Sequence, residues 1–390
     1  MTSSQQYPEF ANHAATNASI PFWKKVTSRL QFSRRRDNYA PKRVFAPLAR
    51  TSQERLDASL TESSFDATTL TPSDVSAARE KGKTVLYLAY GSNLCNETFR
   101  GVRGIKPISQ VNVLVPSLRL TFDLPGIPYI EPCFGNSALR TPDVPYSDDG
   151  DNGNAKGQDY HKDRWHKGLV GVVYEVTLSD YAHIIATEGG GSSYKDVMVD
   201  CYVLPDSDTV PTSPSTLPFK AHTLFAPRLD QNNMRATDHP TRPDPSYAQP
   251  SARYLKLITD GATECNLPAE YQDYLHDIRP YTITSKRQAA GKALFAAIWM
   301  PFIVFVFSLN KMFQDKKGRS PAWLSKLVSL IFAGVWLSYD GVFKEVFGDG
   351  ERTVGDEAMG RRFRQEYGVG GEAEKEALLE EVVELMHQQA

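Results

Sequence analysis

Residues 84–94 read TVLYLAYGSNL, an apolar run that stops abruptly at Gly-Ser-Asn. Aromatic and branched residues alternate over Val85–Tyr90, which predicts a buried strand, and Gly91 permits a sharp turn after it. Ser92 and Asn93 favour the start of a short helix, so this turn is expected to present several unpaired backbone N–H groups. Such groups attract anions. An ordinary strand, turn and helix cap that binds no ligand would have the same sequence pattern. This turn alone therefore predicts no function.

Composition narrows the class of protein. The chain has 390 residues, 41% of them apolar, with 25 prolines and a formal net charge of −2. This composition indicates that only part of the chain is compact, and we place the core between residues 80 and 285. A net charge near zero gives no argument for nucleic acid, and we expect no such partner. The cysteines form no C-x-x-C pair and have no histidines at metal-ligand spacing, which predicts reduced thiols, a reducing compartment and no metal site.

The first 80 residues are rich in Ser, Thr, Gln, Asn and Ala without a sustained hydrophobic period, which predicts a disordered tail. No apolar stretch follows the start, so we expect no secretory signal. A basic cluster between Lys24 and Arg43 alternates with aromatic residues. This cluster could bind anionic lipid, a nuclear-import receptor or a mitochondrial importer, or it could simply be solvated.

Further strands are predicted downstream. Residues 169–176 read LVGVVYEV and give the strongest strand signal after the first. The other expected strands lie at residues 111–123, as one strand or as two interrupted at Pro116, and at 133–139, 197–204 and 220–225. The polar stretch 141–167 contains Asp and His residues, but a solvated insertion explains it better than a metal site.

A helix that begins near Ser179 or Asp180 is expected to end at Glu188, which three glycines follow. A carboxylate in the last turn faces the negative end of the helix dipole, at a cost of up to about 1 kcal/mol. If Glu188 is also buried, both effects raise its pKa, which suits a group that accepts and returns a proton near neutral pH. An exposed glutamate beside a glycine C-cap is the alternative.

Two more helices are expected at the end of this core. The first begins after Ser251 with Tyr254 on its apolar face, and Gly261 can end it. The second runs from about Pro268 to Ile278.

Together these segments resemble the γ-glutamylcyclotransferase family. Four blocks match its pattern in order over about residues 84–285. The blocks are Tyr90–Leu94; Gly171–Tyr174; Glu188-Gly189 with Tyr194; and Pro250–Tyr254 with Gly261-Ala262, Asn266–Pro268 and Glu270-Tyr271. The chain resembles in particular the fungal branch that includes enzymes acting on glutathione conjugates of secondary metabolites.

The resemblance implies an α+β fold: a small, partly open mixed β-barrel with short helices around it and a cavity at one end. This sequence departs from the family mainly by longer loops at 141–167 and 205–250. It also has Ile185-Ala186-Thr187 before Glu188, where acidic residues are commoner in the family.

The resemblance also implies a reaction. The α-amine of a γ-glutamyl group attacks its own side-chain carbonyl, which forms 5-oxoproline and releases an amine, amino acid or peptide without a metal or cofactor. Such a site must fold the substrate, move a proton and stabilise an oxyanion. Glu188 would be the base and then the acid. The implied substrate-binding residues are the N–H groups of Gly91, Ser92 and Asn93, with Tyr90, Leu94, Tyr194 and Tyr254. Core packing is the alternative role for the tyrosines.

Ser92 is disfavoured as a nucleophile. Gly-Ser-Asn-Leu is not the Gly-x-Ser-x-Gly elbow of serine hydrolases, and no histidine has a recognisable partner role.

The last third of the chain has a different character. Residues 293–309 carry no charge and would span about 26 Å as a helix, slightly less than the hydrocarbon layer of a membrane. Residues 322–337 contain Lys326 and are more amphipathic, and the connection between the two stretches is basic, which disfavours a full hairpin. We expect a single span or a shallow hairpin, with a helical pair buried on the barrel as the alternative. The spacing of apolar residues over 372–387 predicts an exposed amphipathic helix.

The chain is thus expected to have four parts: a disordered basic tail (1–80), a catalytic domain (81–285), an apolar membrane-associated segment (286–345) and a charged tail (346–390). We expect an intracellular γ-glutamylcyclotransferase that associates with a membrane through residues 293–337 and faces the cytosol. A non-catalytic binding module of the same fold is the alternative, and a mainly structural membrane protein fits the four blocks less well. Free glutathione, a γ-glutamyl dipeptide and a glutathione conjugate all fit as its small-molecule substrate.

Overall fold

The computed structural model describes residues 43–64, 72–140, 160–187, 195–225, 242–313 and 321–355. The chain divides into two compact units, Met1–Val44 and Phe45–Ala390, and every described helix and strand belongs to the second. Several expectations fall outside the described residues: those for the basic cluster of the tail, most of the polar stretch after residue 140, Glu188, Tyr194 and the helix at 372–387.

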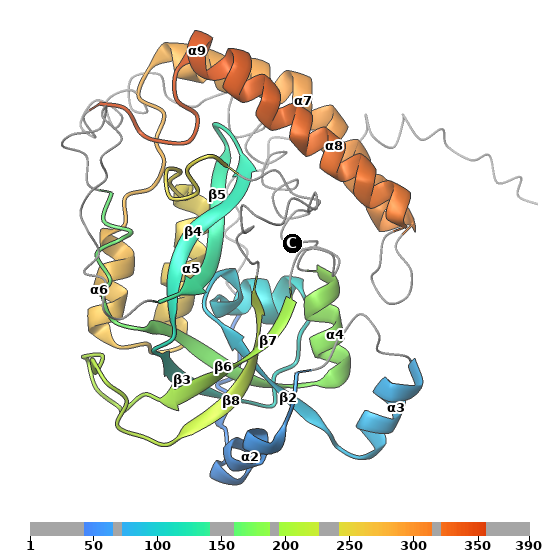
Figure 1. The fold of residues 1–390 in the computed structure, drawn as a ribbon, viewed down its shortest axis with the longest axis vertical. Coiled ribbons are helices and arrows are strands. Elements are labelled where there is room, and N and C mark those ends of the chain that lie inside the picture. Colours follow the sequence, from blue (N-terminus) through green and yellow to red (C-terminus); the bar gives the residue numbers. More distant parts are fainter. Residues whose placement is uncertain are drawn as a thin grey trace, which may run out of the picture. The chain divides into compact units, whose positions relative to one another are not determined.

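A six-stranded mixed sheet forms the centre of the fold (Figure 1). Its spatial order is β1-β3-β6-β2-β8-β7. In chain order the strands are β1 (Ala49–Arg50), β2 (Thr84–Ala89), β3 (Ser109–Val115), β6 (Leu169–Thr177), β7 (Lys195–Val203) and β8 (Pro218–Phe225). Strand β3 also pairs with β7, at Val113 with Val203 and Leu114 with Tyr202, which turns the sheet back on itself. The expected partly open α+β fold is confirmed. The sheet is not a strict barrel, because β2 and β8 meet at only one residue pair.

The two central strands are buried on both faces. β2 pairs antiparallel with β6, with Tyr87 opposite Tyr174, and nearly all residues of both strands are buried. A strand covered on one face alternates apolar and polar residues, whereas a strand covered on both faces is a continuous apolar run. This is why β2 and β6 gave the strongest signals in the sequence. The main hydrophobic core surrounds them.

A separate hairpin follows β3. The segment predicted at 111–123 forms two strands, because a turn at Pro116 separates β3 from β4 (Leu118–Ile127). β4 pairs with β5 (Glu131–Leu139) in an antiparallel ladder with an irregular register after Thr121. Tyr129, at the tip of this hairpin, has a φ of 65°.

Short helices lie around the sheet. They are α2 (Gln53–Ala58), α3 (Pro72–Glu80), α4 (Leu178–Thr187), α5 (Ala252–Glu264) and α6 (Ala269–Asp277). α5 begins where predicted, since the Ser251 hydroxyl accepts a hydrogen bond from Tyr254 N–H at 3.0 Å, but it continues past Gly261. Part of the expected tail is ordered, because β1 pairs with β3 and Leu56 of α2 is buried in the core.

Two long helices follow this domain in sequence. α7 (Lys286–Phe313) and α8 (Ala322–Ser338) lie side by side (Figure 1), and the chain continues through η5 (Tyr339–Phe343) into α9 (Lys344–Phe347). A second hydrophobic cluster packs them against Ile127 and Tyr129 of the β4–β5 hairpin. By length and composition, residues 286–310 and 323–347 could each cross a membrane, and only 28% and 22% of their most apolar windows are buried. Most of these residues are therefore not buried as in a core helix pair.

Candidate functional site

The turn after β2 packs directly against helix α5. The turn, residues 92–94, is closed by a hydrogen bond from Leu94 N–H to Gly91 O at 3.0 Å. A π-helical turn, Glu97–Val102, follows in place of a regular helix. A Cβ added to Gly261 would lie 2.4 Å from the carbonyl carbon of Leu94. Glycine at this position of α5 therefore permits the close approach of the helix to the turn.

The Tyr254 hydroxyl lies between this turn and strand β5. It accepts a hydrogen bond from Gly135 N–H at 2.9 Å, and a Cβ on Gly91 would lie 3.4 Å from it. The ring packs edge-on against Phe134, with centroids 5.3 Å apart. Burial raises the pKa of Tyr254 well above its usual value, so the hydroxyl keeps its proton near neutral pH. The hydroxyl is therefore a neutral hydrogen-bond donor near neutral pH.

Tyr90 is half-buried at the end of β2. Its hydroxyl donates to Ser137 Oγ at 3.1 Å and approaches Leu224 O at 3.4 Å, so it links β5 to β8. The Asn93 side chain turns toward the strand, since its Nδ2 donates to Tyr87 Oη at 2.8 Å. The Leu94 side chain is fully buried in the core. Asn93 and Leu94 thus hold the turn through their side chains. Since the Leu94 N–H is bound by Gly91 O, a role in binding would fall to the backbone of Asn93.

Glu188 and Tyr194 lie outside the described residues, but the elements on either side of them are held together. The Tyr181 hydroxyl of α4 donates to Asp196 Oδ1 of β7 at 2.6 Å. His222 of β8 lies 3.0 Å from both carboxylate oxygens of Asp196 through Nδ1. All three side chains are nearly buried. The sequence did not predict this network, because a single polar residue in an apolar segment does not indicate which distant residue it contacts.

Glu131 is a second group that sequence reasoning missed. Its side chain is almost completely buried and accepts hydrogen bonds from Ser251 N–H at 3.3 Å and from the Arg253 guanidinium at 3.0 Å. Burial raises the pKa of Glu131, while Arg253 and Ser251 favour its charged form. Both donors lie just before Tyr254 in sequence, so Glu131 fixes the first turn of the helix that carries the tyrosine.

The described residues offer little chemistry of other kinds. Among them, no group of three His, Cys, Asp or Glu residues could hold a metal ion. The four cysteines are buried and free of disulfides. Burial raises the pKa of each thiol, to about 11 for Cys265, so these thiols are protonated and poorly nucleophilic near neutral pH.

The structure thus places Tyr90, the turn from Gly91 to Asn93 and Tyr254 around one region at the end of β2. Oriented backbone groups and a protonated phenol are suited to holding a carboxylate or an oxyanion.

Comparison with known proteins follows the same division of the chain. Residues 285–346, which contain α7 and α8, match the family model of the AclK C-terminal domain. The chain is 32% identical over 277 residues to the γ-glutamyl cyclotransferase gliK of Aspergillus fumigatus, covering 68% of this chain and 89% of that protein. It is 28% identical over 278 residues to the γ-glutamyl cyclotransferase aclK of Aspergillus oryzae, covering 70% and 92%.

Solved structures give a weaker likeness. A structure described as a γ-glutamyl cyclotransferase aligns with 52% of this chain and 92% of its own, with 19% identity and a TM-score of 0.34. Family membership rests on the curated relatives, whose identity extends over most of their length. By that similarity, the chain belongs to the γ-glutamyl cyclotransferase family.

Proposed function

We propose that this protein cyclises a γ-glutamyl group to 5-oxoproline and releases the attached amine, amino acid or peptide. The α-amine forms a bond to the side-chain carbonyl carbon, and the amide bond to the leaving nitrogen breaks. No water is consumed, so the reaction is an intramolecular acyl transfer, classed with the lyases, and not a hydrolysis. The observation that carries the proposal is the convergence of the Gly91 turn with the Tyr254 hydroxyl in a chain of this family.

The turn and Tyr254 are assigned to binding and charge stabilisation. The N–H groups of Gly91, Ser92 and Asn93 receive the substrate carboxylate or the developing oxyanion. Tyr254 donates its proton as a hydrogen bond, and its contact with Gly135 N–H limits the directions in which the hydroxyl can point. Tyr90 is assigned to the wall of the site, and so is Tyr194, on the strength of the sequence block that it shares with the family. These contacts hold the glutamyl chain folded, which removes most of the entropic barrier to ring closure.

Glu188 is assigned as the group that moves the proton. It removes a proton from the substrate ammonium, so that the amine can attack, and returns it to the leaving nitrogen. Its support is the sequence: Glu188 is expected in the last turn of a helix that three glycines follow, where the helix dipole disfavours the charged form of a carboxylate.

The substrate class is a compound with a free γ-glutamyl end: glutathione, a γ-glutamyl dipeptide or a glutathione conjugate. Among these, the resemblance of the sequence to the fungal branch of the family favours a glutathione conjugate of a secondary metabolite; gliK and aclK are themselves fungal γ-glutamyl cyclotransferases.

The test is 5-oxoproline release by the full chain from glutathione, γ-glutamyl-alanine and a glutathione S-conjugate. Glu188→Gln is measured beside Glu54→Gln, which removes an exposed carboxylate on α2. Loss of release in Glu188→Gln alone, with substrate still bound, supports the assignment. Equal rates in the two variants would remove Glu188 as the acid–base group, and no release from any substrate would favour a non-catalytic binding module.

Membrane association through residues 293–337, with the catalytic domain on the cytosolic side, is the second part of the proposal. Its support is a row of exposed apolar side chains along α7 and α8. These are Leu294, Ile298, Phe302 and Phe305 on α7, at intervals of three or four residues, and Trp323, Leu330 and Leu337 on α8, at intervals of seven. Such spacing places each set along one side of its helix. Exposed apolar surface of this extent is typical of contact with a membrane or a partner.

A further inference from the structure

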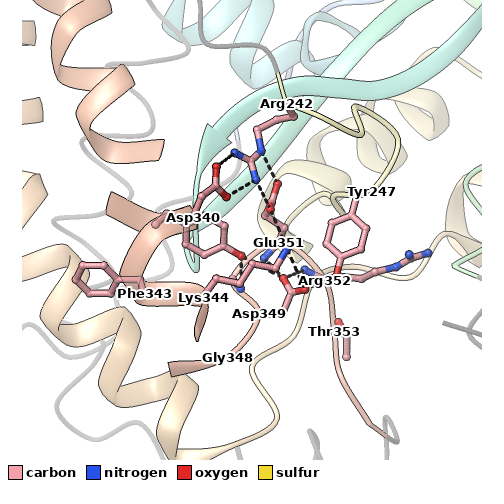
Figure 2. A network of polar contacts seen from close by, with 12 residues as sticks. Arg242, Tyr247, Asp340, Phe343, Lys344, Gly348, Asp349, Glu351, Arg352 and Thr353 are labelled. Carbon is pink, nitrogen blue, oxygen red and sulfur yellow. Dashed lines mark hydrogen bonds and ion pairs between the residues drawn. The ribbon is translucent and has the colours of Figure 1, made fainter. Parts of the chain in front are cut away.

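A short segment after α9 returns to the main domain. We call residues 348–353 the strap; it contains two carboxylates that are almost buried, with Asp349 8% and Glu351 1% exposed (Figure 2). Buried carboxylates are costly unless each has charged or hydrogen-bonding partners, so their partners indicate which contacts hold the strap in place.

Arg242 joins the strap to the end of the long helices. Its guanidinium donates to both oxygens of Asp340 in η5, at 2.6 and 2.8 Å, and to both oxygens of Glu351, at 3.0 and 2.8 Å (Figure 2). The same group lies 4.1 Å from the ring centroid of Trp336 on α8. Burial raises the pKa of Glu351, and Arg242 opposes this effect. Because Glu351 is shielded from solvent, water cannot replace Arg242 as its partner.

Asp349 and Tyr129 fix the shape of the strap. Asp349 accepts hydrogen bonds from the N–H groups of Glu351 and Arg352, at 2.7 and 2.9 Å, and from the hydroxyls of Tyr247 and Tyr339. From the β4–β5 tip, the Tyr129 hydroxyl donates to the carbonyl of residue 348 at 2.7 Å, and its N–H donates to that of residue 350. The strap is therefore held from both the helical side and the hairpin side.

The strap in turn holds the start of α5. Gln249 is fully buried; its N–H donates to Glu351 O at 2.9 Å, and its side-chain oxygen accepts from Thr353 N–H at 2.6 Å. Ser251, the N-cap of α5, lies two residues later and is bound by Glu131 on its other side. The first turn of α5, which contains Tyr254, thus lies between the strap and Glu131.

We propose that Glu351 is a positioning residue for the substrate site: through Gln249 it fixes the first turn of α5 and so the place of the Tyr254 hydroxyl. The strap, which follows the helical pair in sequence, then supports the substrate site. This inference rests on the proposed role of Tyr254 in binding a γ-glutamyl substrate.

The test uses the full chain and three variants. Glu351→Gln keeps the size of the side chain and removes its charge. Asp340→Asn is the matched control, since it removes the other carboxylate on Arg242, which belongs to the helical side and is 44% exposed. Gln249→Met keeps the chain length and the backbone bond to Glu351 O, but its side chain can neither accept from Thr353 N–H nor donate to Arg279 O, so it weakens the junction between the strap and α5 without removing a charge.

Two measurements are made on each variant: KM and kcat for γ-glutamyl-alanine, and hydrogen–deuterium exchange of residues 249–255. Glu351→Gln and Gln249→Met are expected to raise KM about tenfold, below the 10²-fold that a displacement of about 1 Å can cost, with kcat within about twofold. Exchange at 249–255 should rise while that of β2 and β6 stays unchanged. Asp340→Asn should change KM less than about twofold.

Unchanged KM in Glu351→Gln and Gln249→Met would overturn the proposal, and so would unchanged exchange at 249–255. A native chain that releases no 5-oxoproline would contradict the proposed reaction instead. In that case, faster exchange at 249–255 in Glu351→Gln and Gln249→Met would still support the role of Glu351 in fixing the first turn of α5. Unchanged exchange would overturn that role.

Discussion

Gly261→Ala tests the contact between α5 and the turn after β2. Inside a helix, replacing Gly by Ala ordinarily stabilises a protein by roughly 0.5–1 kcal/mol, because glycine loses more backbone freedom on folding. Here the new Cβ would lie 2.4 Å from Leu94 C and 2.5 Å from Cys95 N. Both are backbone atoms, so neither can rotate away as the end of a flexible side chain would. Either α5 or the turn must move.

The expected change in the free energy of unfolding follows from two opposing effects, overpacking and helix propensity. Overpacking a well-packed site costs about 1–3 kcal/mol, and contact with two backbone atoms places this site near the upper end. After the gain in helix propensity is subtracted, the free energy of unfolding falls by about 2 kcal/mol. For a domain of this size, Tm should decrease by roughly 4–8 °C. Movement of α5 also displaces Tyr254 from the Gly91 turn, so kcat/KM should fall by about tenfold or more.

Gly341→Ala is the matched control. Gly341 lies in the helical turn η5, and no heavy atom lies within 4 Å of the Cβ that alanine would add. This variant should keep its activity and be as stable as the native chain or slightly more so. Thermal unfolding is followed by circular dichroism at equal protein concentration, beside the 5-oxoproline assay. A Gly261→Ala variant with the native Tm and native kcat/KM would refute the close packing of α5 on the turn.

Three further predictions concern single side chains. Tyr254→Phe leaves Gly135 N–H without its partner and should lower kcat/KM about tenfold, measured by initial rates, while far-UV circular dichroism stays unchanged; native rates would contradict it. Phe302→Asp with Phe305→Asp removes two exposed apolar side chains and should abolish sedimentation with anionic lipid vesicles without slowing 5-oxoproline release; undiminished sedimentation would exclude this face. Burial raises the pKa of Glu131 in the folded protein, so the folded state binds this proton more tightly than the unfolded state does. The free energy of unfolding should therefore fall as pH rises above about 4.5. Urea unfolding of Glu131→Gln should show a weaker pH dependence than that of the native chain.

Elements with strong local patterns were predictable from the sequence. The Ser251 cap of α5 is a contact between residues three positions apart, and burial on both faces is written directly into β2 and β6 as continuous apolar runs. The blocks that contain Tyr90 and Tyr254 then indicated the family. The curated relatives confirm it.

Features that depend on distant partners were not predictable. Gly261 was expected to end a helix, but its small size serves the approach to Leu94, a contact across more than 160 positions of sequence. The same holds for Glu131, which meets Ser251 from 120 residues away. The strap gave no sign in the sequence, because its single charged residues look like an ordinary solvated segment until their burial is known.

The origin of the product's oxygen atoms tests the central claim most directly. The full chain is incubated with γ-glutamyl-alanine in water enriched in ¹⁸O, and the products are identified by mass spectrometry. Ring closure by the substrate's own amine consumes no water, so we expect 5-oxoproline without ¹⁸O from the solvent, together with free alanine. Glutamate that carries one ¹⁸O atom would instead show attack by water, and it would contradict cyclisation as the reaction of this protein.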